Sequence, residues 1–388
     1  MHSKRILIFS LSYYPLVGGA EVAIREITNR LPDYEFDMIT MRFDSLDKPE
    51  ERIGNVNVYR VGNGSSYINK ILFVPRAVFK AWKLNREKGY GKFWAMMTNM
   101  VFPISVLRIF GNRTPYVLTL QDGDPFEYVF ERLRIRIFSP LLRYGFKHAS
   151  VVQPISTFLA NWATKMGCER IEIVPNGVNV EHFTKGGSQS EQLEVKREIG
   201  KMQGDIFLVS SSRLVRKNGL EDVVSALTYL PENISFINFG VGPEKNNLLT
   251  LAKKLGVERK VRLFDHPGND MLPKYFHASD IFIRPSLSEG QGISFLEGMA
   301  AGLPVIATPV GGIPDFLFDP DKTPHKPPTG LFVNVHDPES IARQVTRLIN
   351  NPNLRETLVV NAKRMVREKY DWNLIAEQMK KRVFEPVL

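Results

Sequence analysis

The chain alternates short β-type runs with longer helical stretches, and it does so in two successive sets. A repeated strand–helix order is typical of parallel sheets with helices on both faces, so two sets predict two such sheets. A chain of 388 residues is longer than one ordinary hydrophobic core accommodates. We therefore predict two doubly wound α/β domains. The β-type runs span residues 5–10, 36–40, 56–61, 93–98, 116–120, 150–154, 206–211, 234–240, 261–264, 281–283 and 304–308.

The most linker-like stretch of the chain is the Gly- and Ser-containing segment 185–190. We place the domain boundary there, which gives a first domain over residues 1–185 and a second domain over residues 186–372. A last helical segment, residues 373–388, follows the second domain. The sequence contains no repeat with a period of about 20–50 residues, which excludes a solenoid.

Composition limits the class of protein. An apolar fraction of 43% and a charged fraction of 24% are typical of a globular protein and exclude a disordered chain. Cys168 is the only cysteine, which excludes an intramolecular disulfide and a cysteine zinc cluster and fits a reducing compartment. The longest apolar run, 93–110, is interrupted by polar residues and a proline and is a poor membrane span. Because the amino terminus also lacks the pattern of a signal peptide, we expect a cytoplasmic protein.

The net charge of +10 is concentrated in the first half of the chain. Between Lys70 and Lys147 there are 14 Lys and Arg residues against 5 Asp and Glu residues, a net charge of 14 − 5 = +9. An excess of this kind suggests an anionic partner, which is a nucleic acid, a membrane surface or a phosphate-bearing substrate.

Within this basic window, residues 69–86 have the periodicity of an amphipathic helix. Arg76, Lys80 and Lys83 share one face, and Trp82, Val78 and Ile71 share another. One interpretation is an ordinary helix that covers a core. The other is a helix that rests on an anionic membrane, at the inner face of the cell membrane, and brings the protein to a lipid-linked molecule.

Two glutamates eight residues apart, Glu289 and Glu297, carry the strongest chemical signal of the second half. Gly290 and Gly292 allow the backbone to approach a ligand, and residues 293–301 then read as a helix. Free N–H groups in such a loop and at a helix start suit a phosphate or diphosphate, while a carboxylate suits the hydroxyls of a sugar or ribose. The alternative is a solvated Glu289 and a Glu297 that caps a first turn.

Arg213 and Lys217 follow the β-type run 206–211. A guanidinium offers two parallel donors to a diphosphate, and an ammonium adds a point charge beside it. Both cations would stabilise negative charge that develops on a departing diphosphate. The alternative is a solvated basic turn.

Segments across nearly the whole chain, in the expected order, resemble the retaining glycosyltransferases of family 4. That family has the GT-B fold, in which two Rossmann-like domains face each other across a cleft. The resemblance rests on Gly18-Gly19-Ala20-Glu21, residues 173–179, Ser212-Arg213-Leu214, the pair Glu289 and Glu297, residues 310–315, and Tyr370-Asp371-Trp372.

The resemblance implies a role for each matching residue. Glu289, Arg213 and Lys217 take the catalytic positions, and the segment 373–388 crosses back to the first domain. Glu21, Asp122 and Asp124 are candidates for the acceptor side. The donor-binding set is Gly18, Gly19, Arg213, Lys217, His266, Glu289, Gln291, Gly292, Ile293 and Glu297.

The sequence departs from the family pattern at two positions. A lysine usually precedes the glycine of the second-domain loop, but Asn218 precedes Gly219 here, and Lys217 is shifted by one. Gln121 stands where many members carry a histidine, and an amide side chain is neither an acid nor a base.

Asp122-Gly123-Asp124 spells the D-x-D of metal-dependent glycosyltransferases with the other large fold. Its place after a strand of the first domain favours an acceptor-site loop over a metal site. We therefore expect no metal and no cofactor.

The resemblance implies transfer of a hexosyl unit from a UDP- or GDP-sugar to a hydroxyl acceptor with retention of anomeric configuration. It implies a front-face route through an oxocarbenium-like state, in which the departing phosphate accepts the acceptor's proton. Cell-envelope polysaccharide or lipid-linked glycan synthesis is the expected pathway. Two alternatives stay open: a nucleotide-sugar epimerase of related fold, and a basic nucleic-acid-binding protein, which would leave the second half of the chain unexplained.

Overall fold

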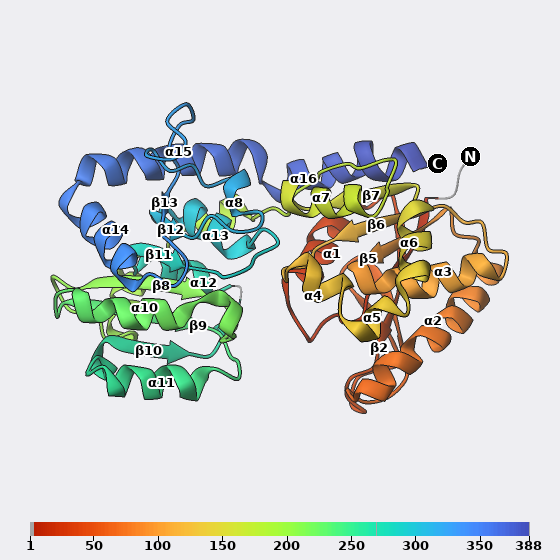
Figure 1. The fold of residues 1–388 in the computed structure, drawn as a ribbon, viewed down its shortest axis with the longest axis horizontal. Coiled ribbons are helices and arrows are strands. Elements are labelled where there is room, and N and C mark those ends of the chain that lie inside the picture. Colours follow the sequence, from red (N-terminus) through yellow and green to blue (C-terminus); the bar gives the residue numbers. More distant parts are fainter. Residues whose placement is uncertain (1–3, 269, 388) are drawn as a thin grey trace. The chain divides into compact units, whose positions relative to one another are not determined.

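The computed structural model describes residues 4–268 and 270–387. The chain divides into two compact units (Figure 1). Unit 1 comprises Met1–Asn176 and Trp372–Leu388, and unit 2 comprises Gly177–Asp371. Each unit has a sheet of its own, as the two sets of β-type runs predict.

Unit 1 is built on a seven-stranded sheet in the order β3-β4-β2-β1-β5-β6-β7. All neighbours are parallel except β3 and β4, which pair antiparallel at the edge. The central strands β5 and β6 are buried along their whole length, which explains their continuous apolar sequences. The strands are β1 Arg5–Phe9, β2 Glu35–Met41, β3 Glu50–Ile53, β4 Val56–Val61, β5 Lys92–Met96, β6 Tyr116–Leu120 and β7 Val151–Pro154.

Helices cover both faces of this sheet because side chains alternate sides along each strand. Phe93 and Ala95 of β5 share a core with the buried faces of α2, α3 and α6. Trp94, between them, contacts Phe384 of the C-terminal segment at a ring distance of 5.1 Å, on the side of α1 and α16. The helices are α1 Gly19–Asn29, α2 Tyr67–Lys88, α3 Val101–Ile109, α4 Phe126–Phe130, α5 Leu133–Arg136, α6 Ser139–Lys147, α7 Thr157–Lys165 and α16 Trp372–Gln378.

The C-terminal segment is joined to unit 1 by polar contacts as well as by packing. The Arg30 Nε atom donates to Asn373 Oδ1 at 2.9 Å, and Arg382 pairs with Glu172 at 3.0 Å. Lys92, which is buried in β5, donates its Nζ proton to the carbonyl oxygen of Phe384. Burial lowers the pKa of Lys92 to about 8.

Unit 2 is built on a six-stranded parallel sheet in the order β10-β9-β8-β11-β12-β13, with a buried apolar cluster on each face. Its strands are β8 Ile206–Ser211, β9 Ile234–Phe239, β10 Val261–Phe264, β11 Ile281–Arg284, β12 Val305–Ala307 and β13 Leu331–Phe332. Its helices are α8 Val180–Thr184, α9 Gln189–Glu198, α10 Leu220–Ala226, α11 Lys245–Lys254, α12 Leu272–His277, α13 Ile293–Ala301, α14 Pro338–Asn350 and α15 Pro352–Lys369.

The junction between the units lies between Asn176 and Gly177, earlier than the Gly- and Ser-containing segment near Lys185 that the sequence suggests. The reason is local: α8 buries Phe183 in the core of unit 2 before that segment begins. Ser188 then caps α9 through a reciprocal capping box with Glu191. The segment therefore starts a helix inside unit 2.

Among residues 4–268 and 270–387, the structure has no helix with the combination of length and apolarity that crossing a bilayer requires.

Candidate functional site

The loop between β11 and α13 contains the two glutamates singled out by the sequence, and its course depends on one glycine. Gly292 is the residue before α13 and has φ = 86°, a left-handed conformation that side chains disfavour. A Cβ atom there would lie 2.5 Å from Arg284 Nη2 and 2.6 Å from the Phe295 ring. Gly292 is therefore required both for the turn and for the close approach of Arg284.

Arg284, the last residue of β11, holds this loop and the start of α13 through hydrogen bonds to three side chains. Its guanidinium is buried and donates to Glu289 Oε2 at 2.6 Å, to Ser294 Oγ at 2.8 Å and to Ser286 Oγ at 3.2 Å. It also lies over the Phe295 ring, 4.2 Å from the centroid. Burial lowers the pKa of Arg284, and the carboxyl groups of Glu289 and Glu297 oppose that shift. The sequence analysis missed Arg284; the only sequence signal is a cation directly after a buried apolar run.

Glu289 is held at its carboxylate and at its backbone. Oε2 accepts from Arg284, and Oε1 accepts from the backbone N–H of Gly290 at 3.0 Å. The Glu289 carbonyl accepts from the N–H of Gly312 at 3.1 Å. A Cβ atom on Gly311, which has φ = 58°, would lie 1.7 Å from that carbonyl oxygen. Gly311 is thus explained by close packing against Glu289, whose carboxylate is fixed rather than solvated.

Glu297 lies one turn into α13 and is half-buried. Burial raises the pKa of Glu297 to about 7, and the positive charge of Arg284 opposes the shift. Near neutral pH this carboxyl therefore exists in both protonation states, and hydrogen bonding to a ligand would shift the balance between them.

The Arg213 loop joins the Glu289 loop because β8 and β11 are neighbours in the sheet. The N–H of Leu287 donates to the Lys217 carbonyl at 2.7 Å. Gly219, at φ = 65°, packs so closely that a Cβ atom would lie 2.0 Å from the Pro285 carbonyl oxygen. Two loops that follow adjacent parallel strands therefore form one polar edge of unit 2.

The shift of one residue in the Arg213 loop has a structural consequence. Asn218 is buried and donates its side-chain N–H to the Arg213 carbonyl at 2.6 Å. It thereby shapes the loop that presents Arg213, whose side chain is exposed. Lys217 is half-buried, with its carbonyl bound to the Glu289 loop.

The remaining second-domain candidates differ in position. Gln291 is buried and Ile293 is half-buried, and both belong to the loop and helix start beside Glu289. His266 follows β10 and is exposed, and its Nδ1 accepts from the N–H of Gly268 at 3.1 Å. In the sheet, β9 and β8 separate β10 from β11, the strand that ends in Arg284.

In unit 1, the glycine loop leads into α1, which begins at Gly19 with Gly18 as its cap residue. Glu21 is buried and accepts from Ser12 Oγ at 2.6 Å. A Cβ atom on Gly18 would lie 2.9 Å from Glu21 Oε2, so the carboxylate is turned back onto the loop. Glu21 therefore holds the glycine loop in shape.

Asp122 also has a local partner. Its Oδ2 accepts from Thr98 Oγ1 at 2.7 Å and from the Thr98 N–H at 3.4 Å. Burial raises the pKa of Asp122. Asp124, two residues further on, is half-buried. The neighbouring Gln121 exchanges two hydrogen bonds of 3.1 Å with the amide of Asn176, which ties this loop to the end of the unit's first segment.

Groups of three or more His, Cys, Asp or Glu side chains arranged to hold a metal ion are absent from the part of the chain that the structure describes. Asp122 and Asp124 are not part of such a group.

The chain is similar to known proteins along its whole length. The family model described as Glycosyltransferase Family 4 matches residues 17–182, and the one described as Glycosyl transferases group 1 matches residues 191–365. An uncharacterized glycosyltransferase of Methanocaldococcus jannaschii is 28% identical and covers 96% of this chain and 96% of its own. The alpha-monoglucosyldiacylglycerol synthase of Acholeplasma laidlawii is 27% identical over 92% of this chain and 91% of its own.

Among solved structures, Anabaena HepE in complex with UDP-glucose has the same fold. Its TM-score is 0.78 at 19% sequence identity, covering 98% of this chain and 99% of that one. The two parallel-sheet units are therefore the two Rossmann-like domains of the GT-B fold, as the sequence resemblance implies.

Proposed function

Because this chain belongs to the family 4 glycosyltransferases, we propose that it transfers a hexosyl unit from a UDP- or GDP-sugar to a hydroxyl acceptor with retention of anomeric configuration. The observation that carries the proposal is the buried Arg284, which fixes the carboxylate of Glu289 in a glycine-shaped loop at the start of α13. A carboxylate held in this way is suited to orient a sugar without moving during the reaction.

Donor binding is assigned to the edge of unit 2 formed by the loops after β8 and β11, which are joined by the hydrogen bond from Leu287 to Lys217. Arg213 and Lys217 provide positive charge for the diphosphate, and the backbone of Gln291, Gly292 and Ile293 provides N–H groups at the start of α13. Glu297 is assigned to the ribose hydroxyls. The hydrogen bonds that these hydroxyls donate to the carboxylate would favour its charged form. The name of the HepE complex, which contains UDP-glucose, supports a nucleotide-sugar donor.

In the proposed reaction, the bond between the anomeric carbon and the diphosphate oxygen breaks while a bond to the acceptor oxygen forms on the same face. The acceptor proton passes to the departing phosphate oxygen. Arg213 and Lys217 stabilise the negative charge that develops on the diphosphate, and this preplaced charge is the main source of rate enhancement. This assignment requires no metal and no cofactor.

The acceptor is proposed to be a sugar or a lipid-linked molecule of cell-envelope glycan synthesis, handled by unit 1 near Gly18, Gly19, Asp122 and Asp124. The relative that makes monoglucosyldiacylglycerol supports a lipid acceptor. With a single cysteine and no disulfide, the chain fits the reducing environment of the cytoplasm.

The first experiment identifies the donor and tests the cationic site. UDP- and GDP-sugars are screened by thermal shift, since a bound donor stabilises the folded state by mass action. With the best donor, Arg213→Ala is expected to lower turnover about 30- to 1,000-fold, or roughly 2–4 kcal/mol, without loss of folding.

Arg216→Ala is the matched control, because Arg216 is an exposed arginine of the same loop without an assigned role. Near-normal turnover of Arg213→Ala would remove Arg213 from the site. Release of an epimerised sugar nucleotide in place of a glycosylated product would contradict the transfer reaction itself. Assays with and without excess chelator test whether side-chain cations suffice.

A further inference from the structure

Helix α2 buries one face and exposes a second apolar face. Phe73, Ala77, Ala81 and Leu84 pack into the core of unit 1, at spacings of four, four and three residues. On the outer side the helix carries large apolar side chains that remain exposed, including Ile68 and Phe79 at 67% and Trp82 at 49%. The exposed set is Tyr67, Ile68, Ile71, Leu72, Phe79 and Trp82, which we call the α2 stripe.

The α2 stripe follows the repeat of a helix. Ile68, Ile71, Leu72, Phe79 and Trp82 lie at i, i+3, i+4, i+11 and i+14, so they share one side of α2. The rings of Phe79 and Trp82 stack at 6.3 Å. Helix α3 packs beside α2 (Figure 1). It ends at Ile109 and is followed by Phe110, which is 82% exposed.

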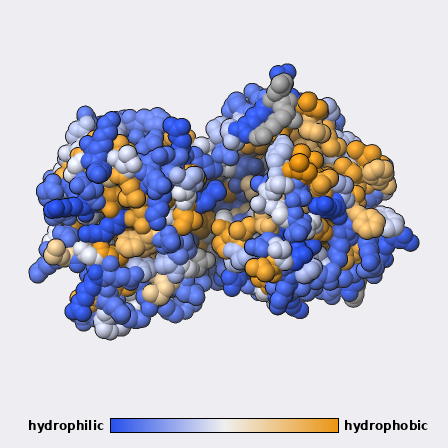
Figure 2. All heavy atoms as spheres, turned by 90° about the horizontal axis from the view of Figure 1, so that it is seen from below, coloured by the Kyte–Doolittle hydropathy of each residue, from blue (hydrophilic) through white to orange (hydrophobic). Residues whose placement is uncertain are grey.

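Figure 1 draws α2 at the lower side of unit 1, and Figure 2 shows the molecule from below. In that view hydrophobic residues gather on the surface of unit 1. Single exposed apolar residues are ordinary, but a run of this length along one helix marks an interaction site.

The charge around the stripe indicates which kind of partner it fits. Helix α2 contains six Lys and Arg residues against one acidic residue, Glu87. Arg76, Lys83 and Arg86 are exposed on or beside the stripe, and the Arg86 guanidinium lies 4.8 Å from the Trp82 ring centroid. Lys70 is also exposed, but its place two residues after Ile68 puts it on the opposite side of the helix. Exposed apolar and aromatic side chains flanked by cations are typical of helices that lie in the interface of an anionic bilayer.

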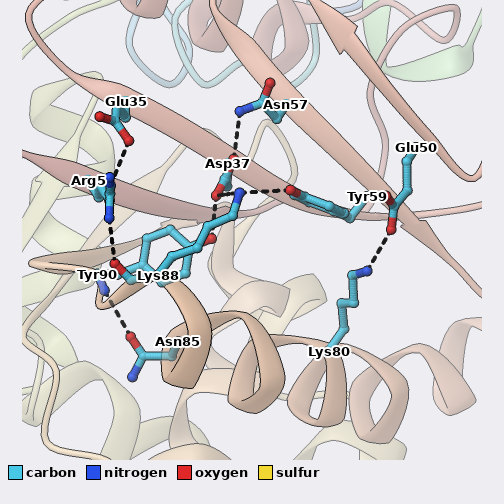
Figure 3. Close-up of polar contacts among 10 residues, drawn as sticks. All are labelled: Arg5, Glu35, Asp37, Glu50, Asn57, Tyr59, Lys80, Asn85, Lys88 and Tyr90. Atoms are coloured by element: carbon cyan, nitrogen blue, oxygen red, sulfur yellow. Dashed lines mark hydrogen bonds and ion pairs between the residues drawn. The ribbon is translucent and has the colours of Figure 1, made fainter.

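The other two cations of α2 fasten the helix to the sheet (Figure 3). Lys88 Nζ lies 2.7 Å from Asp37 Oδ2 and 2.8 Å from the Tyr59 hydroxyl. Lys80 Nζ lies 2.8 Å from Glu50 Oε1 and 4.5 Å from the Tyr59 ring centroid. Lys80 is thus bound in an ion pair within unit 1, and of the three cations that the sequence places on one face, Arg76 and Lys83 are the exposed ones.

Further contacts complete this anchor. Asp37 also accepts from Asn57 at 2.9 Å and from the Tyr90 hydroxyl, and Arg5 donates to the Lys88 carbonyl at 2.8 Å. The last turn of α2 is therefore bound to β1, β2 and β4 (Figure 3). The helix is an integral part of unit 1 and presents its stripe outward without detaching.

We propose that unit 1 rests on an anionic lipid bilayer through the α2 stripe, with Arg76, Lys83 and Arg86 at the headgroup phosphates. The topology connects this surface to the acceptor candidates. Helix α2 begins beyond the carboxyl end of β4, and the Gly18 loop and Asp122 follow the carboxyl ends of β1 and β6 in the same sheet. A hydroxyl carried by a lipid is therefore the acceptor class that this surface serves, an inference that rests on the proposed function.

Vesicle sedimentation of the full chain tests the surface. The unmodified protein is expected to sediment with vesicles that contain phosphatidylglycerol at low salt, to release at about 0.5 M salt, and to stay in solution with pure phosphatidylcholine. Phe79→Ser/Trp82→Ser and Arg76→Glu/Lys83→Glu/Arg86→Glu are each expected to weaken binding at least tenfold. All five positions are exposed, so unchanged melting temperatures are expected to verify folding.

Lys253→Glu/Lys254→Glu/Arg259→Glu is the matched control, because it makes the same change of charge at exposed positions of unit 2. It is expected to keep binding. The proposal is overturned if the unmodified protein stays in the supernatant, if the control weakens binding as much as the α2 variant, or if the Phe79/Trp82 variant binds normally. A dimer in solution that this variant converts to monomers, with vesicle binding unchanged, would assign the stripe to a second copy of the chain instead.

A separate measurement distinguishes this surface from the proposed function. Stabilisation by the sugar nucleotide depends on unit 2, so the Phe79/Trp82 variant is expected to keep the full donor-induced thermal shift. Lost vesicle binding with a retained shift supports the lipid surface. If no UDP- or GDP-sugar shifts the unmodified protein, the proposed function fails, while the sedimentation result still decides the surface.

Discussion

At the scale of single residues, the ion pair between Arg284 and Glu289 brings two charges together in a half-buried loop. Removing charges from water is costly, and the cost is offset only when the geometry is good and the remaining donors are bound. Here the guanidinium also bonds Ser286 and Ser294. Arg284 therefore acts as a positioning residue, because it fixes the carboxylate that is proposed to lie beside the sugar.

Replacing Arg284 with lysine tests this positioning role. Arg284→Lys keeps the charge but loses the planar fork that contacts Glu289 and Ser294 together. We expect kcat to fall about 10- to 100-fold while KM for the donor changes little, because orientation is lost and the diphosphate contacts remain. Steady-state kinetics measure both constants. Ser286→Ala removes only the longest of the three bonds and is the control. Unchanged kcat in Arg284→Lys would mean that a positive charge alone suffices.

Ionisation of Glu297 is expected to lower the free energy of unfolding of the protein as the pH rises. Its pKa is raised to about 7 in the folded chain, from an ordinary value near 4.5. Between about pH 4.5 and pH 7 the folded state binds more protons than the unfolded state, so this residue lowers stability as pH rises through that window. Glu297→Gln removes the cost. We expect its melting temperature to equal that of the unmodified protein near pH 4.5 and to exceed it by about 2–8 °C at pH 8, on the order of 1–2 kcal/mol.

Melting curves over pH 4.5–8 measure this difference, and Glu289→Gln provides the contrast. Since Glu289 is paired with Arg284, its neutralisation is expected to lower the melting temperature at pH 8. Parallel curves for Glu297→Gln and the unmodified protein would contradict a costly Glu297 charge.

At the scale of helices and strands, local patterns in the sequence predict the elements whose burial is uniform. β5, β6 and β8 read as continuous apolar runs because helices cover both sides of a parallel sheet. β3, at Glu50–Ile53, was missed because it is a short edge strand with partly exposed charged side chains.

The hydrophobic periodicity of α2 predicts a helix but not which of its faces is buried. The sequence groups Trp82, Val78 and Ile71 as an apolar face, yet Trp82 and Ile71 are exposed and the buried face includes Ala77 and Ala81. Small alanines contribute little to a hydrophobic pattern but fit closely against a sheet, whereas the large residues that dominate the pattern face outward. Which apolar face is covered depends on the distant strands β2 and β4 and not on α2 itself.

The candidate site divides in the same way. The turn at Gly292 and the loop after β8 were predictable, because both are local features of the sequence. Arg284 was not, since its partner Ser294 is ten residues away and the contact exists only once α13 returns over β11. The bond between Asp122 and Thr98 likewise depends on β5 and β6 being neighbours in the sheet.

At the scale of the whole molecule, the two units differ in how their chain is organised. Unit 2 is one continuous segment with six strands and two buried clusters of its own, and its ends are joined by a 2.7 Å hydrogen bond from Val178 N–H to the Tyr370 carbonyl. Unit 1 needs both ends of the chain, because its buried Lys92 and Trp94 are covered by Phe384. Folding of unit 2 can therefore be completed without unit 1, whereas the reverse order requires residues beyond position 371.

This asymmetry predicts that residues 177–371, produced alone, fold cooperatively and bind the donor without transferring the sugar. Arg213, Lys217, Glu289 and Glu297 all lie in this segment, whereas the acceptor candidates lie in unit 1. A donor that shifts the full chain is expected to raise the melting temperature of the fragment as well, since stabilisation follows the ratio of free donor to Kd. Calorimetry with and without donor measures the shift, and the fragment with Arg213→Ala is the control, in which the shift is expected to shrink. A fragment that folds but shows no shift, beside a full chain that does, would mean that unit 1 supplies an essential part of the donor site, with the backbone of Gly18 and Gly19 as the first residues to examine.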